Sequence, residues 1–269
     1  MNKRTLLSKV AAAPHIVWSI LFIVAPLIFV LFYALTDPNG AFTLDNLSAL
    51  SEHGNTFFLS ISLSLIATVI CVLIGYPMAY FISRAKKSRQ RFLLMASLIP
   101  MWINLLIRTY SMMALMDDAG LINTLLGTSF HIVGTKGAVI FGMVYDFLPY
   151  MILPIYTVMS KLDTRLLEAA QDLGCNSMQT MFRVVFPLTR SGVISGITMV
   201  FVPSISTFYI SQKLGGGTFE LLGDTIERQF SNPDTYNIGA AISLVMMVLI
   251  LISMAVMNKF TDEEEEMIP

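Results

Sequence analysis

The sequence predicts an all-α membrane protein with about six transmembrane helices, and three features support this prediction. Hydrophobic residues make up 55% of the 269 residues and charged residues only 13%, whereas soluble domains carry about 25% charged residues. Uncharged apolar runs recur along the chain, each close to the roughly 20 residues that cross a hydrocarbon core as a helix. The basic residues are concentrated in alternate connections between these runs. We therefore expect a single transmembrane domain.

The expected spans follow the apolar runs in order: residues 16–36, 57–83, 92–115, 138–160, 191–212 and 236–258. The first run comes after Lys3, Arg4 and Lys9, as the apolar part of a signal peptide would. It is too long for that part, and the alanines at 11–13 precede it, whereas a cleavage site would follow it. We therefore expect the first run to be retained as a span.

Three connections carry few basic residues and are expected on the outer side. Residues 37–56 contain the turn formers Pro38 and Gly40. Residues 116–136 repeat apolar side chains at helical spacing, which predicts a short surface helix. Residues 213–235 begin near three glycines, which indicate a hinge because they lack the lysine and the preceding strand of a phosphate-binding loop. We expect no nucleotide-binding site in this chain.

The remaining connections are basic. Lys and Arg cluster before the first span, after the second, after the fourth and after the sixth: Lys3, Arg4 and Lys9; Arg84, Lys86, Lys87, Arg89 and Arg91; Lys161, Arg165, Arg183 and Arg190; and Lys259. The positive-inside bias places these connections and both termini in the cytoplasm. An even number of spans independently requires both termini on one side. Residues 260–269 then form an acidic cytoplasmic tail.

The cytoplasmic connection at 161–190 has the pattern of two amphipathic helices. In the first, Asp163 or Thr164 is suited to cap the start, and Gly174 supplies a left-handed stop. Its apolar positions share one face: Leu162, Leu166, Ala169 and Leu173. In the second, Ser177 is suited to cap the start and Pro187 to end it. Its apolar positions also share one face: Met178, Met181, Phe182, Val185 and Phe186.

Two environments fit such a pair of helices, a lipid surface and a groove on another protein. Interfacial helices carry a basic polar face, whereas the first helix mixes Glu168 and Asp172 with Arg165. That mixture suits a protein groove better than an anionic leaflet. Amphipathicity alone leaves both environments open.

Residues 168–174 read Glu-Ala-Ala-Gln-Asp-Leu-Gly, with Val184 ten positions after Gly174 and Pro187 three further on. In order, spacing and position between spans, this segment resembles the EAA loop of permease subunits of bacterial ATP-binding-cassette (ABC) importers. The resemblance implies the type I ABC importer permease fold (MetI-like). It also implies that the loop contacts a groove of a cytoplasmic ATPase through Glu168, Ala169, Ala170, Asp172, Gly174, Phe182 and Pro187. Phe186 replaces the leucine usual before the proline.

Four further segments narrow the resemblance: residues 75–81, 99–110, 208–211 and 223–226. They are similar to the spermidine/putrescine permease (PotB-like) family. Permeases for sulfate, ferric iron or molybdate share the loop and remain alternatives. The resemblance implies a second homologous permease, two copies of a cytoplasmic ATPase that use ATP and Mg, and an extracellular polyamine-binding protein. It places the chain in a bacterial plasma membrane, with no cofactor of its own and no nucleic-acid partner.

A polyamine carries several ammonium charges, so a transport pathway for it should offer aromatic faces and carboxylates. The candidates within or near the spans are Trp102, Tyr110, Tyr145, Asp146, Phe208 and Tyr209. Packing or interfacial anchoring also explains any single aromatic residue, and Trp102 ranks first because it lies mid-span.

Asp146 is a charged group within an expected span, where such a group is costly and usually functional or paired. Arg108 is expected at a similar depth, so a structural ion pair and a contact with substrate both remain open. Further carboxylates in the outer connections could form an electronegative mouth: Asp117, Asp118, Glu220 and Asp224, together with Glu227. Ordinary solvated loop charge explains them equally well.

Two other classes of membrane protein fit the sequence less well. A secondary carrier usually shows an internal repeat and ion sites at broken helices, and neither is visible. An intramembrane enzyme needs a nucleophile with a base, or metal ligands, in its spans. The histidines lack ligand spacing, and Cys71 and Cys175 are not expected to meet. We therefore expect no catalytic residue and no metal site.

Overall fold

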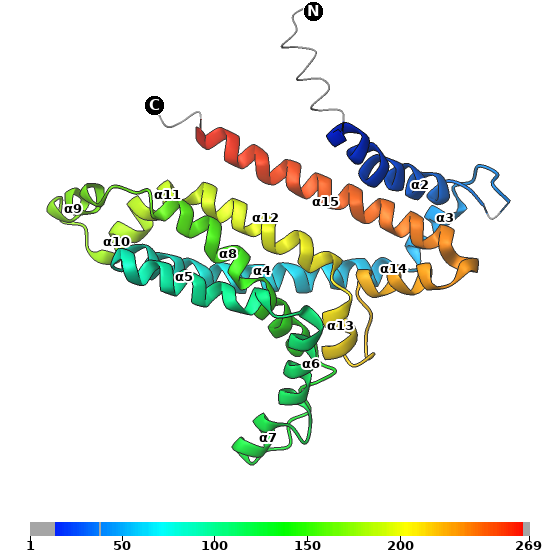
Figure 1. The fold of residues 1–269 in the computed structure, drawn as a ribbon, viewed down its shortest axis with the longest axis horizontal. Helices are drawn as coiled ribbons and strands as arrows, with labels where there is room; N and C mark the ends of the chain where they lie inside the picture. Colours follow the sequence, from blue (N-terminus) through cyan, green and yellow to red (C-terminus); the bar gives the residue numbers. More distant parts are fainter. Residues whose placement is uncertain (1–13, 38, 266–269) are drawn as a thin grey trace, which may run out of the picture. The chain divides into compact units, whose positions relative to one another are not determined.

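The computed structural model describes residues 14–37 and 39–265, and nearly all of them are helical. Figure 1 shows the order of the helices along the chain. The chain divides into two compact units, one built from residues up to 55 and from 225–249, the other from 56–224 and from 250 onward. The basic residues Lys3, Arg4 and Lys9 lie outside the described residues.

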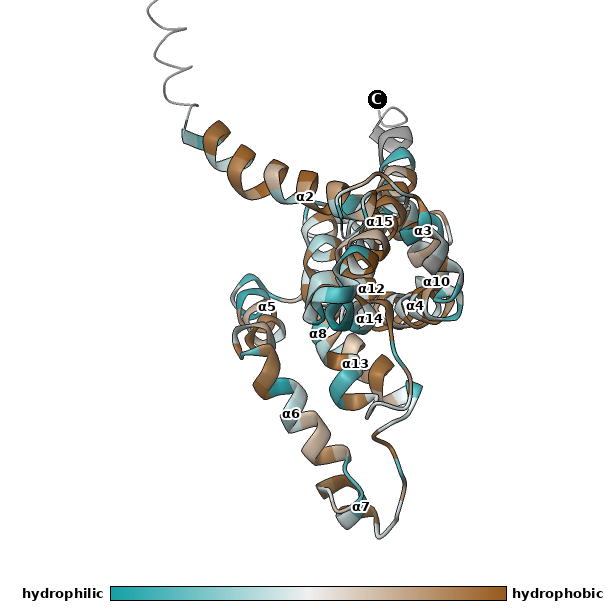
Figure 2. Ribbon diagram, turned by 90° about the vertical axis from the view of Figure 1, so that its right-hand side faces the viewer, coloured by the Kyte–Doolittle hydropathy of each residue, from teal (hydrophilic) through white to brown (hydrophobic). Residues whose placement is uncertain are grey.

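The first unit contains an apolar helix over Pro14–Ala34, in which a π-helical turn at Ile20–Val24 precedes α2 (Ala25–Ala34). The short helix α3 (Asp45–Ser48) follows, and the first half of α15 (Tyr236–Glu265) completes the unit. Ala34, Ala240 and Ala241 are fully buried in its centre. Figure 2 shows the hydrophobic colouring along α2, whose large apolar side chains are mostly exposed, as expected for a helix that faces lipid.

The second unit holds the remaining helices. In chain order they are α4 (Gly54–Arg84), α5 (Lys87–Trp102), α6 (Leu105–Met116), α7 (Leu121–Leu126), α8 (Lys136–Met159), α9 (Thr164–Asp172), α10 (Ser177–Thr180), α11 (Phe186–Leu188), α12 (Arg190–Ser206) and α13 (Tyr209–Leu214). Helix α14 (Leu222–Ser231) begins in this unit and continues into the first. Figure 1 shows α9 and α10 at one end of α8 and α12, and α6, α7 and α13 toward the other end.

Helix α8 is the centre of the second unit because glycines let three other helices approach it. Gly192 and Gly196 of α12 are four residues apart and face the backbone of α8, where a Cβ on Gly192 would lie 3.0 Å from the Pro154 carbonyl oxygen. A Cβ on Gly75 of α4 would lie 2.9 Å from Met151 Cγ, and one on Gly142 would lie 2.5 Å from Leu214 Cδ1 of α13. Small residues at such contacts are typical of helix packing in membranes.

Four helices are long and apolar enough to cross a membrane: Pro14–Ala34, Gly54–Arg84, Lys136–Met159 and Pro233–Lys259. Two further candidates are bent pairs, Lys87–Trp102 with Leu105–Leu126 at 90°, and Ser177–Leu188 with Arg190–Ser206 at 70°. Counting each bent pair as one span gives six, the number expected from the sequence.

The expected span at 92–115 is not one continuous helix. Helix α5 contains Pro100 and ends at Trp102, and Ile103 is extended. The side chain of Asn104 then caps α6 by accepting a hydrogen bond from the Leu106 N–H at 2.8 Å. Proline removes a helical hydrogen bond, and asparagine supplies a new helix start, so these two residues explain the break.

Two expectations for the second half of the chain also differ from the structure, the span at 191–212 and the tail at 260–269. The helix expected over 191–212 ends at Ser206, Thr207 is extended, and α13 follows as a separate helix. Helix α15 runs to Glu265, so the segment expected as an acidic tail over 260–269 begins as helix. Residues 266–269 lie outside the described part of the chain.

We expect Gly192→Val to lower the stability of the protein, because the added side chain would meet the backbone of α8, which cannot rotate away. Overpacking of this kind costs about 1–3 kcal/mol, measured as a lower midpoint of thermal unfolding in detergent. Gly137→Val is the matched control, since a Cβ at Gly137 meets only Thr135 Oγ1 at 3.7 Å. Equal midpoints for the two variants would contradict the packing described here.

Candidate functional site

A helical hairpin at one end of the second unit contains the segment that resembles the EAA loop. Asp163 caps its first helix, α9, by accepting a hydrogen bond from the Arg165 N–H at 2.9 Å. Helix α9 ends in a Schellman motif, in which Gly174 has φ +86°. The N–H of Gly174 donates to Gln171 O at 2.9 Å, and the N–H of Cys175 donates to Ala170 O at 3.0 Å.

The second helix of the hairpin starts one residue earlier than the sequence indicated. Asn176, not Ser177, is its cap, because Asn176 and Gln179 form a capping box. The Gln179 N–H donates to Asn176 Oδ1 at 2.8 Å, and the Asn176 N–H donates to Gln179 Oε1 at 2.9 Å. Both Asn and Ser are good caps, so only the reciprocal bond to Gln179 distinguishes them.

Pro187 does not end this helix, contrary to the expectation from the sequence. A π-helical turn at Met181–Val185 precedes it, and the helical conformation continues through α11, which contains Pro187. The bend comes at Thr189, whose hydroxyl donates to Val185 O at 2.8 Å. The Thr189 hydroxyl also lies 3.1 Å from the Tyr76 hydroxyl of α4, so the base of the hairpin is joined to a long span.

One face of α9 is apolar and exposed. Leu166, Ala169 and Leu173 share this face and are all exposed, and 87% of Leu173 is accessible. Ala170 is buried against the rest of the hairpin, while Glu168 and Asp172 are exposed. We call the surface formed by Leu166, Ala169 and Leu173 the α9 face. A single exposed leucine is common on protein surfaces, but three apolar positions on one short helix form a surface suited to a partner.

Beside the hairpin, an apolar groove of about 400 Å³ lies between α4 and the second helix. Its lining includes Tyr76 and Phe81 of α4 and Met178, Phe182 and Phe186 of the hairpin. Phe182, one of the expected coupling residues, therefore lines this groove and is mostly exposed.

Near the middle of α8, Asp146 forms a buried ion pair with Arg108 of α6. Arg108 Nη1 lies 2.9 Å from Asp146 Oδ1, and the two side chains are 10% and 1% exposed. Arg108 Nη1 does not point at the carboxylate with hydrogen-bond geometry, and both carboxylate oxygens lack a hydrogen bond among the described residues. Of the two interpretations that the sequence left open, the ion pair is present.

The expected pathway aromatics fall into two groups. Tyr110 of α6 and Tyr209 of α13 meet edge to face with ring centroids 6.2 Å apart. The ammonium of Lys213 lies 5.3 Å from the centroid of the Tyr110 ring and 5.8 Å from that of the Tyr209 ring. Tyr145, Phe208 and Trp102 are exposed, as is Tyr110, and Trp102, at the break after α5, is 89% accessible. No pattern in the sequence associates Lys213 with the two tyrosines.

The carboxylates expected at an outer mouth have different surroundings. Asp224 is buried, and its oxygens accept hydrogen bonds from the Ser211 hydroxyl and the Leu221 N–H, each at 2.8 Å. Asp117, Asp118 and Glu220 are exposed. The carboxylate of Asp118 contacts His131 Nδ1 at 2.8 Å.

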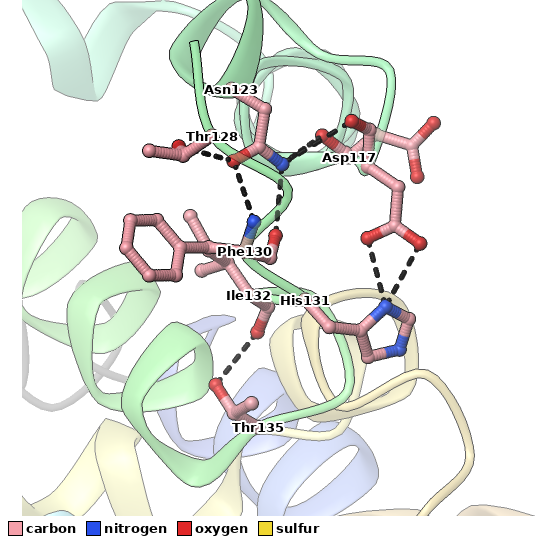
Figure 3. A network of polar contacts seen from close by, with 8 residues as sticks. Asp117, Asn123, Thr128, Phe130, His131, Ile132 and Thr135 are labelled. Carbon is pink, nitrogen blue, oxygen red and sulfur yellow. Dashed lines mark hydrogen bonds and ion pairs between the residues drawn. The ribbon is translucent and has the colours of Figure 1, made fainter. Parts of the chain in front are cut away.

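Figure 3 shows how this outer segment is held together. The side-chain amide of Asn123 donates to the carbonyl oxygens of Asp117, Asp118 and Phe130, at 3.3, 3.3 and 2.8 Å. Its oxygen accepts from the Phe130 N–H and the Thr128 hydroxyl. No pattern in the sequence distinguishes Asn123, which is buried and fixes the fold of the segment between α6 and α8.

A bundle of apolar helices with two broken spans, and with a capped helical hairpin at one end, is the architecture of a membrane transport permease. The chain belongs to the family of binding-protein-dependent transport system inner membrane components, which matches residues 71–262. It is therefore a membrane protein of the inner-membrane permease class.

Two relatives make the comparison more specific. The chain is 36% identical to the spermidine/putrescine transport system permease protein PotB of Haemophilus influenzae, covering 96% of both chains. It is 35% identical to PotB of Escherichia coli K12, covering 86% of this chain and 90% of that one.

Two solved structures have the same fold. A bacterial ABC transporter involved in the import of the acidic polysaccharide alginate matches with a TM-score of 0.78 at 17% identity, covering 97% of this chain and 96% of that one. The MetNI methionine ABC transporter matches with a TM-score of 0.61 at 15% identity, covering 81% and 98%. The type I ABC importer permease fold expected from the sequence is thereby confirmed.

Replacing Asp146 with Asn should destabilise the protein, because it leaves the Arg108 charge buried without its partner, which typically costs about 3–5 kcal/mol. Arg108→Gln should do the same. The double variant should lose less stability than the sum of the two single losses, since no charge remains unpaired. Folded yield and the thermal midpoint in detergent measure these effects.

Additive losses in that cycle would show that the ion pair does not stabilise the fold. Transport by the Asp146→Asn protein, normalised to the amount of folded protein, tests the other role. Normal transport per folded molecule would remove Asp146 from the substrate pathway.

Proposed function

We propose that this chain is a permease subunit of an ATP-driven importer for polyamines such as spermidine and putrescine. The assignment of the cargo is supported by the PotB relatives, which match nearly the whole chain. The chain itself does no chemistry: it forms half of the translocation pathway and alternates between outward-open and inward-open forms.

The observation that carries this proposal is the exposed α9 face on a rigid turn. Leu166, Ala169 and Leu173 are exposed in the isolated chain. The hairpin therefore has an apolar surface that no other part of the described chain covers. We infer that a cytoplasmic ATPase covers this surface, with Glu168 and Asp172 at its polar edge. Ala170 and Gly174 stabilise the hairpin: Ala170 is buried, and Gly174 adopts the left-handed conformation at the turn.

The proposed assembly contains a second homologous permease, two copies of the ATPase and an extracellular polyamine-binding protein. The ATPase copies bind and hydrolyse ATP with Mg, and this chain binds no cofactor. Both termini and the hairpin lie on the cytoplasmic side of a bacterial plasma membrane. The clustering of Lys and Arg in alternate connections supports this orientation.

The proposed pathway passes the aromatic and polar residues between α6, α8 and α13. Trp102, Tyr110, Tyr145, Phe208 and Tyr209 offer ring faces, and each cation–π contact contributes about 0.5–2 kcal/mol, depending on how far the cation is desolvated. Asp117, Asp118 and Glu220 add negative charge at the outer mouth of the pathway. Asp146 and Asp224 stabilise the fold, Asp146 through Arg108 and Asp224 through Ser211 and the Leu221 N–H.

Disrupting the α9 face should release the ATPase. In complexes purified with all natural partners, we expect Leu173→Glu to lower the amount of co-eluting ATPase by roughly tenfold or more, because it places a charge in an apolar contact. Gln171→Glu is the matched control: Gln171 is exposed on the same helix, and the helical period places it on the opposite side from Leu173. Glu168→Lys should reduce both co-elution and transport.

Full co-elution of the ATPase with Leu173→Glu and Glu168→Lys would refute the docking role. The cargo is tested separately, by uptake of radiolabelled spermidine, sulfate and molybdate into proteoliposomes that contain the complete transporter and its binding protein. Uptake of an anion without uptake of spermidine would refute the polyamine assignment and leave the docking role intact.

A further inference from the structure

An internal lysine occupies the aromatic cluster between α6 and α13. Tyr110 and Tyr209 belong to different helices, and the Lys213 ammonium lies within 6 Å of both ring centroids, at 5.3 and 5.8 Å. Distances in this range are those of cation–π interactions. We call Tyr110, Tyr209 and Lys213 the ammonium cluster.

The fold fixes the ring of Tyr209, on α13, and leaves the lysine as the adaptable member. Helix α13 is held on α8 because Gly142 admits Leu214 and Ile210, and its buried Ser211 hydroxyl donates to Asp224. Its last carbonyl, Leu214 O, accepts the N–H of Gly134 at 2.7 Å. Tyr209 therefore has a fixed place. Lys213 follows one helical turn later on a flexible four-carbon stem.

No carboxylate neutralises this ammonium within the described part of the chain. Lys213 is half-buried, and none of the ion pairs found there includes it. Two buried acidic groups of the same unit have other partners: Asp146 pairs with Arg108, and Asp224 accepts from Ser211 and Leu221. In the described structure the Lys213 ammonium therefore contacts the two tyrosines, through their rings and the Tyr110 hydroxyl.

The Lys213 side chain also has the chemistry of one end of the proposed cargo. A lysine side chain ends in a primary ammonium on an alkyl stem, and so do both ends of putrescine and spermidine. A site that accepts one of these groups accepts the other by the same interaction with the rings. Because the two cations repel each other, they exclude one another from a single pair of rings.

We propose that the rings of Tyr110 and Tyr209 form a binding site for a primary alkylammonium group, which Lys213 fills in this conformation and which a cargo ammonium fills during transport after displacing Lys213. The identity of the cargo rests on the proposed function; the site for an alkylammonium does not.

The exchange of Lys213 for a cargo ammonium meets two opposing requirements of a transport site, binding and release. A site must bind its cargo well enough to admit it and weakly enough to release it. With Lys213 as a tethered competitor, the attraction between the rings and the cargo ammonium is offset by the loss of the same attraction for the lysine. The return of Lys213 then helps to expel the cargo toward the next part of the pathway.

The test uses the complete transporter with its binding protein omitted, and radiolabelled n-propylammonium, which matches the part of the side chain that Lys213→Ala removes. We expect saturable binding to the Lys213→Ala complex. Binding to the wild type and to Lys213→Arg should be at least about tenfold weaker, because both keep a cation on the rings. Uncharged n-propanol should not compete, because it lacks the charge that the rings attract.

Ring variants identify the site. Tyr110→Phe and Tyr209→Phe in the Lys213→Ala background should retain binding, since the ring faces remain, whereas Tyr110→Leu with Tyr209→Leu should abolish it. Thermal midpoints must match that of the Lys213→Ala complex, and Lys213→Met provides a second vacant-site variant. Equal binding to wild type and Lys213→Ala, or binding that survives the loss of both rings, would overturn the proposal.

Spermidine separates this proposal from the proposed function. Spermidine should compete with n-propylammonium on the Lys213→Ala complex and bind that complex about three- to tenfold more tightly than wild type. Binding of n-propylammonium without spermidine transport by the wild type would retain the site and reject the cargo. Spermidine transport with no n-propylammonium binding to Lys213→Ala would reject the site and retain the cargo.

Discussion

A backbone N–H or C=O group in hydrocarbon has no water to bond, so a membrane helix can stop only where the protein supplies a replacement partner. Two of the helix breaks in the described part of the chain, at Ile103 and at Thr207, follow that constraint. Asn104 caps the helix that begins after the first break, and α13 after the second is held by contacts to α8 and Gly134. Both breaks release a short helix from a long one, and the two short helices, α6 and α13, meet at Tyr110 and Tyr209. The polar and aromatic chemistry of the pathway therefore depends on where the backbone can be satisfied.

Helix α8 connects the two ends of the second unit. Gly142, in its first half, packs against α13, Asp146 near its middle pairs with Arg108, and the backbone at Pro154 packs against Gly192 of α12. Helix–helix association in lipid relies on close packing, because the lipid tails are as apolar as the side chains. A shift of α12 along α8 would have to move two glycines past a backbone that they already touch. The contact therefore favours a few discrete registers over continuous sliding.

Much of this architecture is local and could be predicted from the sequence. The number of spans follows from the apolar runs, and the left-handed turn at Gly174 follows from a glycine placed after an amphipathic helix. The break at Ile103 could not be predicted from hydropathy, which does not distinguish a continuous helix from two; Pro100 and Asn104 were the available signals. Lys213 reads as loop charge because its partner Tyr110 is distant in sequence, and only the tertiary structure brings the two together. Similar depth in adjacent spans correctly suggested that Arg108 could reach Asp146.

The turn of the hairpin also determines how motion passes through it. Four consecutive N–H groups, from Leu173 to Asn176, are all bonded within the hairpin, to Ala169 O, Gln171 O, Ala170 O and Gln179 Oε1. No peptide in this turn is left to rotate as a soft joint. These bonds and the Thr189–Tyr76 contact give a continuous bonded connection from α9 to α4, along which a displacement of α9 acts. A loop of glycines without such bonds would absorb more of that displacement.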